Sequence, residues 1–144
     1  ISECKAFYGM TSHAHGVDAD IQDEEDIYES CKWLKDMALN LGCVVVCSGK
    51  IDVITDGKEV NLISNGCDML SRITGTGCML NVAIATFLAS YSPLLACIKA
   101  TCYYEVAAEK TKCEGPGTFH MHFMDEIYKL TSFDESLFKI EVLE

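Results

Sequence analysis

Apolar residues recur at helical spacing in the first third of the chain. They fall on one face of a 3.6-residue period, at Ile27, Cys31, Leu34, Ala38 and Leu41. Acidic residues crowd the start of this stretch and Gly42 follows its end, as the helix dipole and C-capping by glycine favour. The pattern predicts an amphipathic helix over residues 23–41.

A short uninterrupted apolar run, CVVVCS, follows at residues 43–48. Such a run is typical of a strand covered on both faces, as in a parallel sheet. Further along, Asp56-Gly57 stands between two β-rich segments, and this dipeptide is a strong hairpin signal. We therefore expect a buried strand followed by a β-hairpin.

Three more helices and a last strand are expected in the second half of the chain. A glycine-rich turn leads into a helix that ends near residue 89. Ser92-Pro93 opens a helix over residues 94–110, because proline is favoured at the first helical position. The sequence GPGTF at residues 115–119 breaks the chain, a helix follows over residues 118–130, and the alternating tail predicts an edge strand. Together these elements predict one α/β layered domain over residues 1–144.

The charge balance is strongly acidic, with 22 Asp and Glu against 11 Lys and Arg and a formal net charge of −11. The sequence has no basic stripe, which disfavours nucleic-acid binding, and an anionic ligand would need local help from helix termini, backbone amides or a metal ion. No apolar run reaches the roughly 20 residues of a membrane span. The nine cysteines include no C-x-x-C spacing, so we interpret them as reduced, mostly buried thiols of a cytoplasmic protein.

The segment with the clearest chemistry is Gly75-Thr76-Gly77-Cys78, at the start of an expected helix. The first backbone N–H groups of a helix have no intrahelical partner and carry the positive end of the dipole, and glycines let a ligand come close. The four residues therefore predict an anion hole for a phosphate or a phosphoryl group. Cys78 is the candidate general base, because a thiol at a helix N-terminus has a lowered pKa. The alternative is a glycine turn followed by a cysteine that packs inward.

Histidine and cysteine positions invite a zinc interpretation, which their spacing disfavours. The candidate ligands are His13, His15, Cys113, His120 and His122. H-x-H on a helix points the two rings to different faces, and no C-x-x-C pair supports a closed site. The acidic residues at 23–26, within the charge run at 18–26, are interpreted as a solvated helix start.

An ordered set of short motifs resembles the C-terminal half of the hydroxyethylthiazole kinase family of the ribokinase-like superfamily. The motifs are Ser48-Gly49, DVITDG at residues 52–57, Asn65-Gly66, TGTGC at residues 74–78 and GPGTF at residues 115–119. Ser2-Glu3 and GVDA at residues 16–19 match the segment after the family's R-G-N motif. The resemblance implies an α/β, ribokinase-like fold with a mostly parallel sheet flanked by helices, of which this chain is the C-terminal portion.

The resemblance also implies a reaction and residue roles. The reaction is transfer of the ATP γ-phosphoryl group to the hydroxyl of 4-methyl-5-(2-hydroxyethyl)thiazole in thiamine salvage. Cys78 stands where most ribokinase-like kinases have an Asp base in a G-x-G-D turn, and Gly75 lies near the thiazole alcohol. Ser48 contacts an ATP phosphate, Glu3 lies near a Mg²⁺ ion, and the protein is a homotrimer with the thiazole site between subunits.

Two features separate this chain from a whole kinase of that family. The family's Arg just ahead of G-N-x-S-E, and the whole N-terminal half, would fall before Ile1. A ribokinase-like kinase of another small alcohol and a non-catalytic nucleotide-binding or assembly module therefore stand as alternatives. Ser48 as a turn residue and Glu3 as a solvated carboxylate near the chain end are the simpler interpretations of those two side chains.

Overall fold

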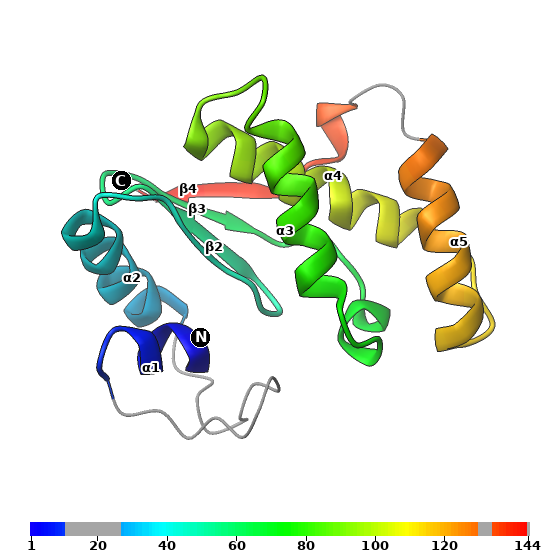
Figure 1. Ribbon diagram of the computed structural model, residues 1–144, viewed down its shortest axis with the longest axis horizontal. Coiled ribbons are helices and arrows are strands. Elements are labelled where there is room, and N and C mark those ends of the chain that lie inside the picture. The colour runs from blue at the N-terminus through cyan, green and yellow to red at the C-terminus, as the bar shows by residue number, and fades with distance from the viewer. Residues whose placement is uncertain (11–26, 130–133, 144) are drawn as a thin grey trace. The chain divides into compact units, whose positions relative to one another are not determined.

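The computed structural model describes residues 1–10, 27–129 and 134–143. The chain divides into two compact units (Figure 1). Unit 1 consists of Ile1–Leu62 with Glu141–Glu144, and unit 2 of Ile63–Ile140. Each unit has its own cluster of buried apolar residues, so the two are described in turn.

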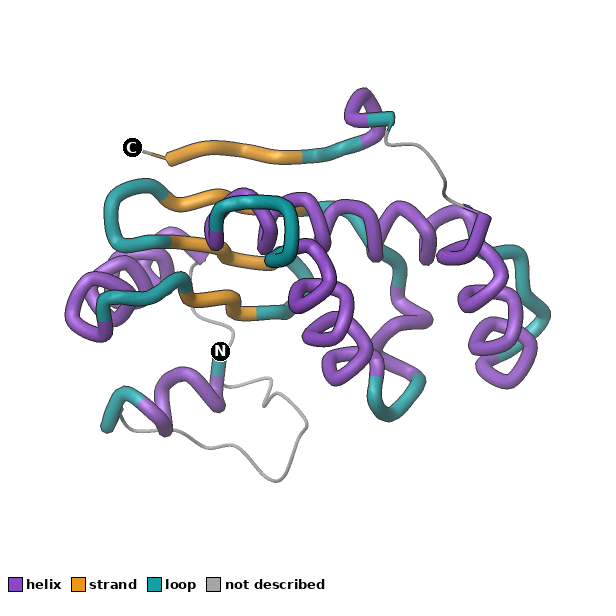
Figure 2. The backbone as a smooth tube through the Cα atoms, turned by 45° about the horizontal axis from the view of Figure 1, so that its top comes forward, coloured by secondary structure: helices purple, strands orange, loops and turns teal. Residues whose placement is uncertain are grey.

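A four-stranded sheet lies mostly in unit 1 (Figure 2). Its strands are β1 (Val45–Cys47), β2 (Asp52–Thr55), β3 (Val60–Ile63) and β4 (Ile140–Leu143), and they neighbour one another in this order. β4 therefore lies at one edge of the sheet, which confirms the prediction of an edge strand in the tail. Both middle strands are buried along their whole length.

The direction of strand pairing differs from the mostly parallel sheet that the resemblance implied. β1 and β2 are antiparallel, with Val45 opposite Thr55 and Cys47 opposite Val53. Residues 48–51 join β1 to β2 and residues 56–59 join β2 to β3. Connections this short favour antiparallel neighbours, because a crossover between parallel strands needs about a dozen residues or more. The apolar run at residues 43–48 thus predicted the buried strand correctly and its parallel setting wrongly.

The turn between β2 and β3 is held by side chains of its own residues. Asp56 Oδ1 accepts hydrogen bonds from the backbone N–H of Lys58 at 2.8 Å and of Glu59 at 3.2 Å. Thr55 Oγ1 donates to Glu59 O at 2.7 Å and accepts from Gly57 N at 3.0 Å. The backbone bonds to its carboxylate lower the pKa of Asp56. These contacts confirm the hairpin that Asp56-Gly57 predicted.

In the described part of unit 1, the sheet is accompanied by the helices α1 (Ser2–Phe7) and α2 (Ile27–Leu41). α2 confirms the C-terminal part of the helix expected over residues 23–41, and Gly42 follows it with φ 63°. Residues 23–26 and the acidic run at 18–26 lie outside the described residues. Leu34 and Ala38 of α2 are fully buried and share a core with Val53 of β2. α1 was not expected, because six residues are too few for a helical pattern to stand out.

Among its described residues, unit 2 has three α-helices and two short 3₁₀ helices. They are η2 (Asp68–Arg72), α3 (Thr76–Phe87), α4 (Pro93–Lys110), α5 (Pro116–Lys129) and η3 (Glu135–Leu137). α4 packs against both α3 and α5. The core of unit 2 contains three packed aromatic rings. The Tyr104 ring meets the Phe123 ring edge-on, with 4.8 Å between the ring centroids, and the Phe119 ring stacks on Phe123 with 5.3 Å between centroids. The three expected helices are confirmed, with Pro93 as the first residue of α4.

Asn65 ties the segment ahead of β4 to the rest of unit 2. Its Nδ2 donates to Leu137 O at 3.0 Å and to Glu109 Oε1 at 3.2 Å, and its Oδ1 accepts from Lys139 N at 2.8 Å. Lys139 Nζ also donates to Glu109 Oε1 at 2.8 Å. The buried amide is thereby satisfied, and the start of β4 is fixed in position.

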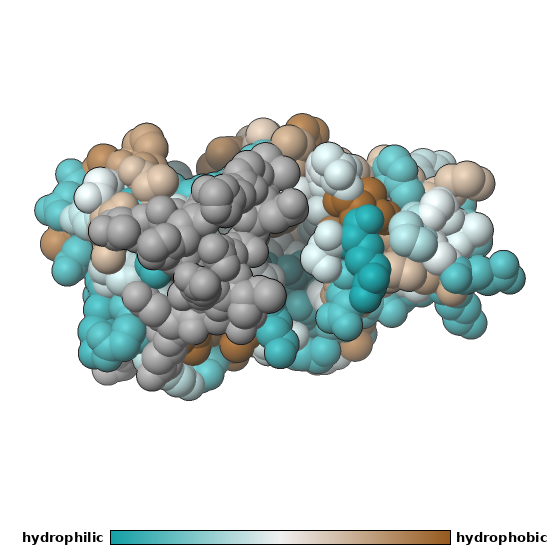
Figure 3. All heavy atoms as spheres, turned by 90° about the horizontal axis from the view of Figure 1, so that it is seen from below, coloured by the Kyte–Doolittle hydropathy of each residue, from teal (hydrophilic) through white to brown (hydrophobic). Residues whose placement is uncertain are grey.

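α3 is apolar in sequence yet largely exposed. Leu80 is its buried residue, while Val82 is 68% exposed. Elsewhere in unit 2, Met121 of α5 is also 68% exposed. Hydrophobic residues lie among hydrophilic ones on the face that Figure 3 shows. Much of the apolar surface of α3 is therefore exposed within unit 2.

Candidate functional site

The Gly75–Cys78 segment forms the N-terminus of α3, as the sequence predicted. Gly75 is the N-cap and adopts φ 98° and ψ −1°, a left-handed conformation that favours glycine. A Cβ added at Gly75 or at Gly77 would meet nothing within 4 Å. The backbone at this terminus is thus open to a ligand, and its first N–H groups point outward with the positive end of the helix dipole.

Hydrogen bonds that involve Leu70 and Tyr104 help to hold this turn in place. Thr76 Oγ1 donates to Leu70 O at 2.9 Å, which links the turn to η2. The Tyr104 hydroxyl, on α4, donates to Thr76 O at 2.9 Å. Burial raises the pKa of Tyr104, so its hydroxyl stays a donor at physiological pH. A hole that stabilises developing charge works best when its donors are fixed beforehand, and these two bonds supply that fixation.

The Tyr104 and Leu70 contacts were not predicted from the sequence. Tyr104 lies 28 residues from Thr76 along the chain, and Leu70 is a half-buried apolar residue that contributes only its carbonyl oxygen. Local spacing carries no signal for a contact of this kind. The helical pattern of α4 indicates only that one of its faces is buried.

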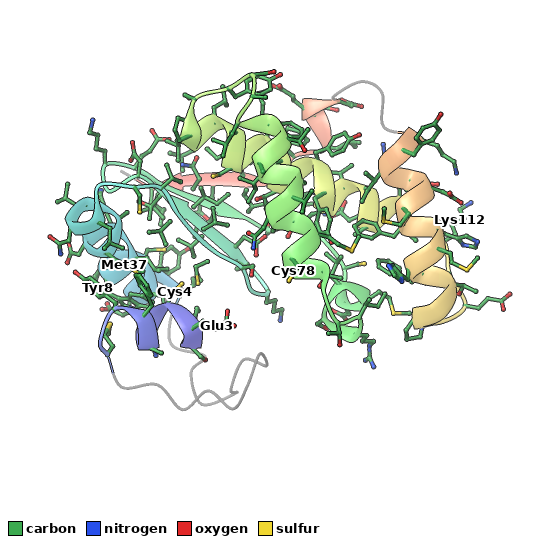
Figure 4. The ribbon with its side chains drawn as sticks, viewed as in Figure 1. Glu3, Cys4, Tyr8, Met37, Cys78 and Lys112 are labelled. Atoms are coloured by element: carbon green, nitrogen blue, oxygen red, sulfur yellow. The ribbon has the colours of Figure 1, made fainter. Side chains whose placement is uncertain are left out.

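Cys78 is the third residue of α3, and its side chain is exposed (Figure 4). The alternative in which this cysteine packs inward is therefore wrong. An exposed thiol beside open amide groups has access to the same ligand that those amides bind. The arrangement can hold an anion and place a sulfur next to it.

Ser48 and Glu3 belong to unit 1, whereas the Gly75–Cys78 turn belongs to unit 2. Ser48 directly follows β1 and is exposed. The next residue, Gly49, donates its N–H to Asp52 Oδ1 at 2.8 Å, which closes the loop that carries Ser48. Glu3 is an exposed residue in the first turn of α1.

The donor set for a metal ion is small. Within residues 1–10, 27–129 and 134–143, no group of three or more His, Cys, Asp or Glu side chains is placed to hold a metal. Glu3 is a single carboxylate, which fits Mg²⁺ because this ion is usually held by one or two carboxylates together with substrate phosphates. His13 and His15 lie outside the described residues, and His122 Nδ1 lies 2.7 Å from Lys112 O. In the same described ranges, no helix combines the length and apolar character needed to cross a membrane.

The fold and the site define an α/β protein with a glycine-capped helix terminus suited to anions. A sequence profile of the hydroxyethylthiazole kinase family matches residues 1–133. The chain belongs to this family, which confirms the resemblance drawn from the motifs.

Relatives with this name agree over nearly the whole chain. Hydroxyethylthiazole kinase 2 of Clostridium botulinum (strain 657) is 36% identical over 135 residues, which cover 91% of this chain and 51% of the relative. Hydroxyethylthiazole kinase of Pyrococcus furiosus is 37% identical over 145 residues, covering 99% of this chain and 54% of the relative. The chain spans about half the length of the curated relatives it matches.

A solved structure supports the fold. The hydroxyethylthiazole kinase protein of Pyrococcus horikoshii OT3 matches with a TM-score of 0.75 and 30% sequence identity, over 82% of this chain and 48% of the other. The architecture of this chain is therefore that of part of a thiazole kinase fold.

Proposed function

We propose that this chain carries the C-terminal catalytic part of an ATP-dependent kinase. Its acceptor is the hydroxyl of 4-methyl-5-(2-hydroxyethyl)thiazole. The observation that supports this most directly is the open, glycine-capped first turn of α3 with an exposed Cys78. Membership of the hydroxyethylthiazole kinase family supports the choice of acceptor.

Each residue of the turn has a separate task in this proposal. The backbone N–H groups of the 75–78 turn receive the negative charge that develops on the transferred phosphoryl group. Cys78 Sγ is the general base that takes the proton from the substrate hydroxyl as its oxygen attacks phosphorus. Gly75, which has no side chain, leaves room for the alcohol beside the amides. Thr76 keeps the turn in place through its bond to Leu70 O.

Two residues of unit 1 have proposed roles toward the nucleotide. Ser48 donates its hydroxyl to a phosphate oxygen of ATP, and Glu3 helps to hold Mg²⁺. The ion, when bound, neutralises phosphate charge. Neutralisation of the phosphates by a cation favours ATP binding, because the chain itself carries a formal net charge of −11.

The remaining expectations concern the whole protein. We propose a cytoplasmic homotrimer with the thiazole pocket between subunits, in which segments beyond this chain complete the pocket. Because the chain spans about half of its relatives, one second function stands beside the first: a module that binds nucleotide without turnover. A kinase acting on another small alcohol uses the same turn and differs only in its pocket.

The test is a phosphorylation assay with ATP, Mg²⁺ and hydroxyethylthiazole. It is run on this chain and on the longest chain that its gene encodes, each with Cys78→Ala and with Cys43→Ala. Cys43 is the matched control, since it is also an exposed thiol and lies outside the turn. We expect Cys78→Ala to lower kcat by about 10²- to 10⁴-fold and Cys43→Ala to leave it unchanged.

The other outcomes separate the hypotheses. Turnover by the longer chain alone would assign the missing half of the pocket to segments outside this chain. ATP binding without turnover by either chain would favour the nucleotide-binding module. Full activity of Cys78→Ala would contradict the role of Cys78 as the base.

A further inference from the structure

The hydroxyl of Tyr104 reaches the first turn of α3 from the neighbouring helix. α3 and α4 pack against each other (Figure 1), and the Tyr104 hydroxyl donates to Thr76 O at 2.9 Å. Thr76 is the first residue of α3, so α-helix geometry lets its carbonyl oxygen also accept from the N–H four residues later. A carbonyl oxygen has two lone pairs, and Tyr104 therefore adds a second donor without displacing the helical bond.

The Thr76 carbonyl and the Gly77 N–H belong to one peptide unit. A trans peptide is planar, so a contact that fixes the direction of its C=O also fixes the direction of its N–H. Linked hydrogen bonds polarise one another, hence a donor on the Thr76 oxygen makes the Gly77 N–H a stronger donor. This N–H is among the first of α3, which have no acceptor within the helix and face an approaching anion.

The position of Gly77 needs support from its neighbours. Glycine has the freest backbone of all residues, and a Cβ built at Gly75 or Gly77 would meet nothing within 4 Å. The contacts that hold the turn therefore fall on the residue between them. Thr76 Oγ1 donates to Leu70 O at 2.9 Å, while Thr76 O accepts from Tyr104.

Tyr104 is itself held firmly by packing. Its side chain is 3% exposed and belongs to the core cluster of unit 2, with Leu80, Ala107 and Phe119. Its ring meets the Phe123 ring edge-on, with 4.8 Å between the ring centroids. Because these contacts set the place of the ring, Tyr104→Phe keeps the packing and removes only the hydroxyl.

We propose that Tyr104 is a positioning residue for phosphoryl transfer. Through the Thr76 carbonyl, it fixes and polarises the Gly77 N–H, which receives charge that develops on the transferred group. A donor aimed at charge that develops in the transition state lowers the barrier to transfer more than it favours binding of the substrates. This effect on turnover rests on the proposed function, whereas the polarisation of the Gly77 N–H does not.

The first test observes the Gly77 amide by NMR. In this chain Thr-Gly occurs only at residues 74–75 and 76–77, so threonine labelled with ¹³C at its carbonyl carbon and glycine labelled with ¹⁵N give paired signals from Gly75 and Gly77 alone. We expect Tyr104→Phe to shift the ¹⁵N signal of Gly77 upfield, and further than that of Gly75, because the Thr76 oxygen has lost a donor. A Gly77 signal that stays in place would overturn the proposal.

Tyr103→Phe is the matched control. Tyr103 precedes Tyr104 on α4, and its hydroxyl also donates to a backbone carbonyl oxygen, that of Ile127, at 3.0 Å. Its ring packs against Phe87, which is the last residue of α3 and lies at the other end of that helix from Gly77. We expect this variant to leave the Gly77 signal unchanged. A shift as large as that of Tyr104→Phe would overturn the proposal, because it would show a general response to changes in α4.

Steady-state kinetics of the longest chain that the gene encodes then measure the effect on turnover. We expect Tyr104→Phe to lower kcat about tenfold, which is less than the 10²- to 10³-fold that loss of a whole donor costs, and to leave both KM values within about twofold. Tyr103→Phe should keep the wild-type kcat. Equal losses of kcat in the two variants, or a raised KM with unchanged kcat in Tyr104→Phe, would overturn the proposal.

Failure of this proposal and failure of the proposed function give different results. A wild-type longer chain without turnover contradicts the proposed function, while the Gly77 signal still decides whether Tyr104 acts on that N–H. A wild-type chain that turns over, beside an equally active Tyr104→Phe variant, contradicts the role of Tyr104 and leaves the proposed function intact.

Discussion

At the residue scale, two glycines of unit 1 share a left-handed backbone but differ in the space around them. Gly42 follows α2 with φ 63°, and a Cβ there would meet nothing within 4 Å. Gly57 lies in the β2–β3 turn with φ 87°, and a Cβ there would lie 2.8 Å from Leu39 N and 2.9 Å from Leu39 Cα. The first position requires glycine for its conformation, and the second for both its conformation and close packing against α2.

We therefore expect Gly57→Ala to lower the free energy of unfolding more than Gly42→Ala does. Gly42→Ala should cost about 1–2 kcal/mol, the strain of an L-residue in left-handed backbone. Gly57→Ala should cost about 2 kcal/mol beyond that, because the obstacle is backbone of α2, which cannot swing aside as a flexible side chain does. Urea unfolding of the two variants measures the difference. Equal losses would mean that the turn moves away from α2 at no cost.

At the same scale, the candidate site shows what local sequence can and cannot predict. Gly75, Gly77 and Cys78 were found because a glycine-rich helix start is encoded in adjacent residues. Tyr104, whose hydroxyl holds Thr76 O, was not found, because that contact depends on how α4 packs against α3.

At the element scale, helices and strands were predicted better than the way they pair. α3, α4 and α5 begin and end close to the expected residues, because turn residues and helical periodicity mark their limits. The prediction that β1 runs parallel to its neighbour was wrong, because a continuous apolar run indicates burial on both faces and carries no information about the direction of the neighbouring strand. The short connections at residues 48–51 and 56–59 indicate the antiparallel direction better than the apolar run does.

The contact between Asn65 and the segment ahead of β4 leads to a prediction for one element. Asn65→Ala removes the bonds to Leu137 O and Lys139 N, so we expect faster amide hydrogen exchange over residues 137–143. The overall free energy of unfolding should fall by about 1–3 kcal/mol, because the hydrogen bonds of the buried Asn65 amide are lost. Asn81→Ala, at an exposed position of α3, is the control and should change neither quantity. Unchanged exchange at Lys139 would show that β4 is fixed by its pairing with β3 alone.

At the scale of the whole molecule, the dominant property is negative charge. The formal net charge of −11 disfavours the approach of ATP phosphates, and the proposed anion hole at the start of α3 offers only partial positive charge. In the proposed function, a divalent cation therefore supplies much of the attraction.

Removal of Mg²⁺ should consequently weaken ATP binding by about tenfold or more, as measured by calorimetry with and without a chelator at equal ionic strength. Glu3→Gln should reduce the gain that Mg²⁺ brings, whereas Glu114→Gln, an exposed carboxylate of unit 2, should leave it unchanged. ATP affinity that does not respond to the chelator would contradict the assignment of Mg²⁺ to this chain.

The order of the sheet has a consequence for the newly made chain. β3 ends at Ile63 and its neighbour β4 begins at Ile140, so α3, α4 and α5 are all synthesised before β4. During that interval one edge of β3 has no partner, and an open strand edge is a template for pairing with other chains. Because pairing over such a sequence separation is also slow, a nascent chain, or one cut before Ile140, should aggregate through β3 far more readily than the finished chain.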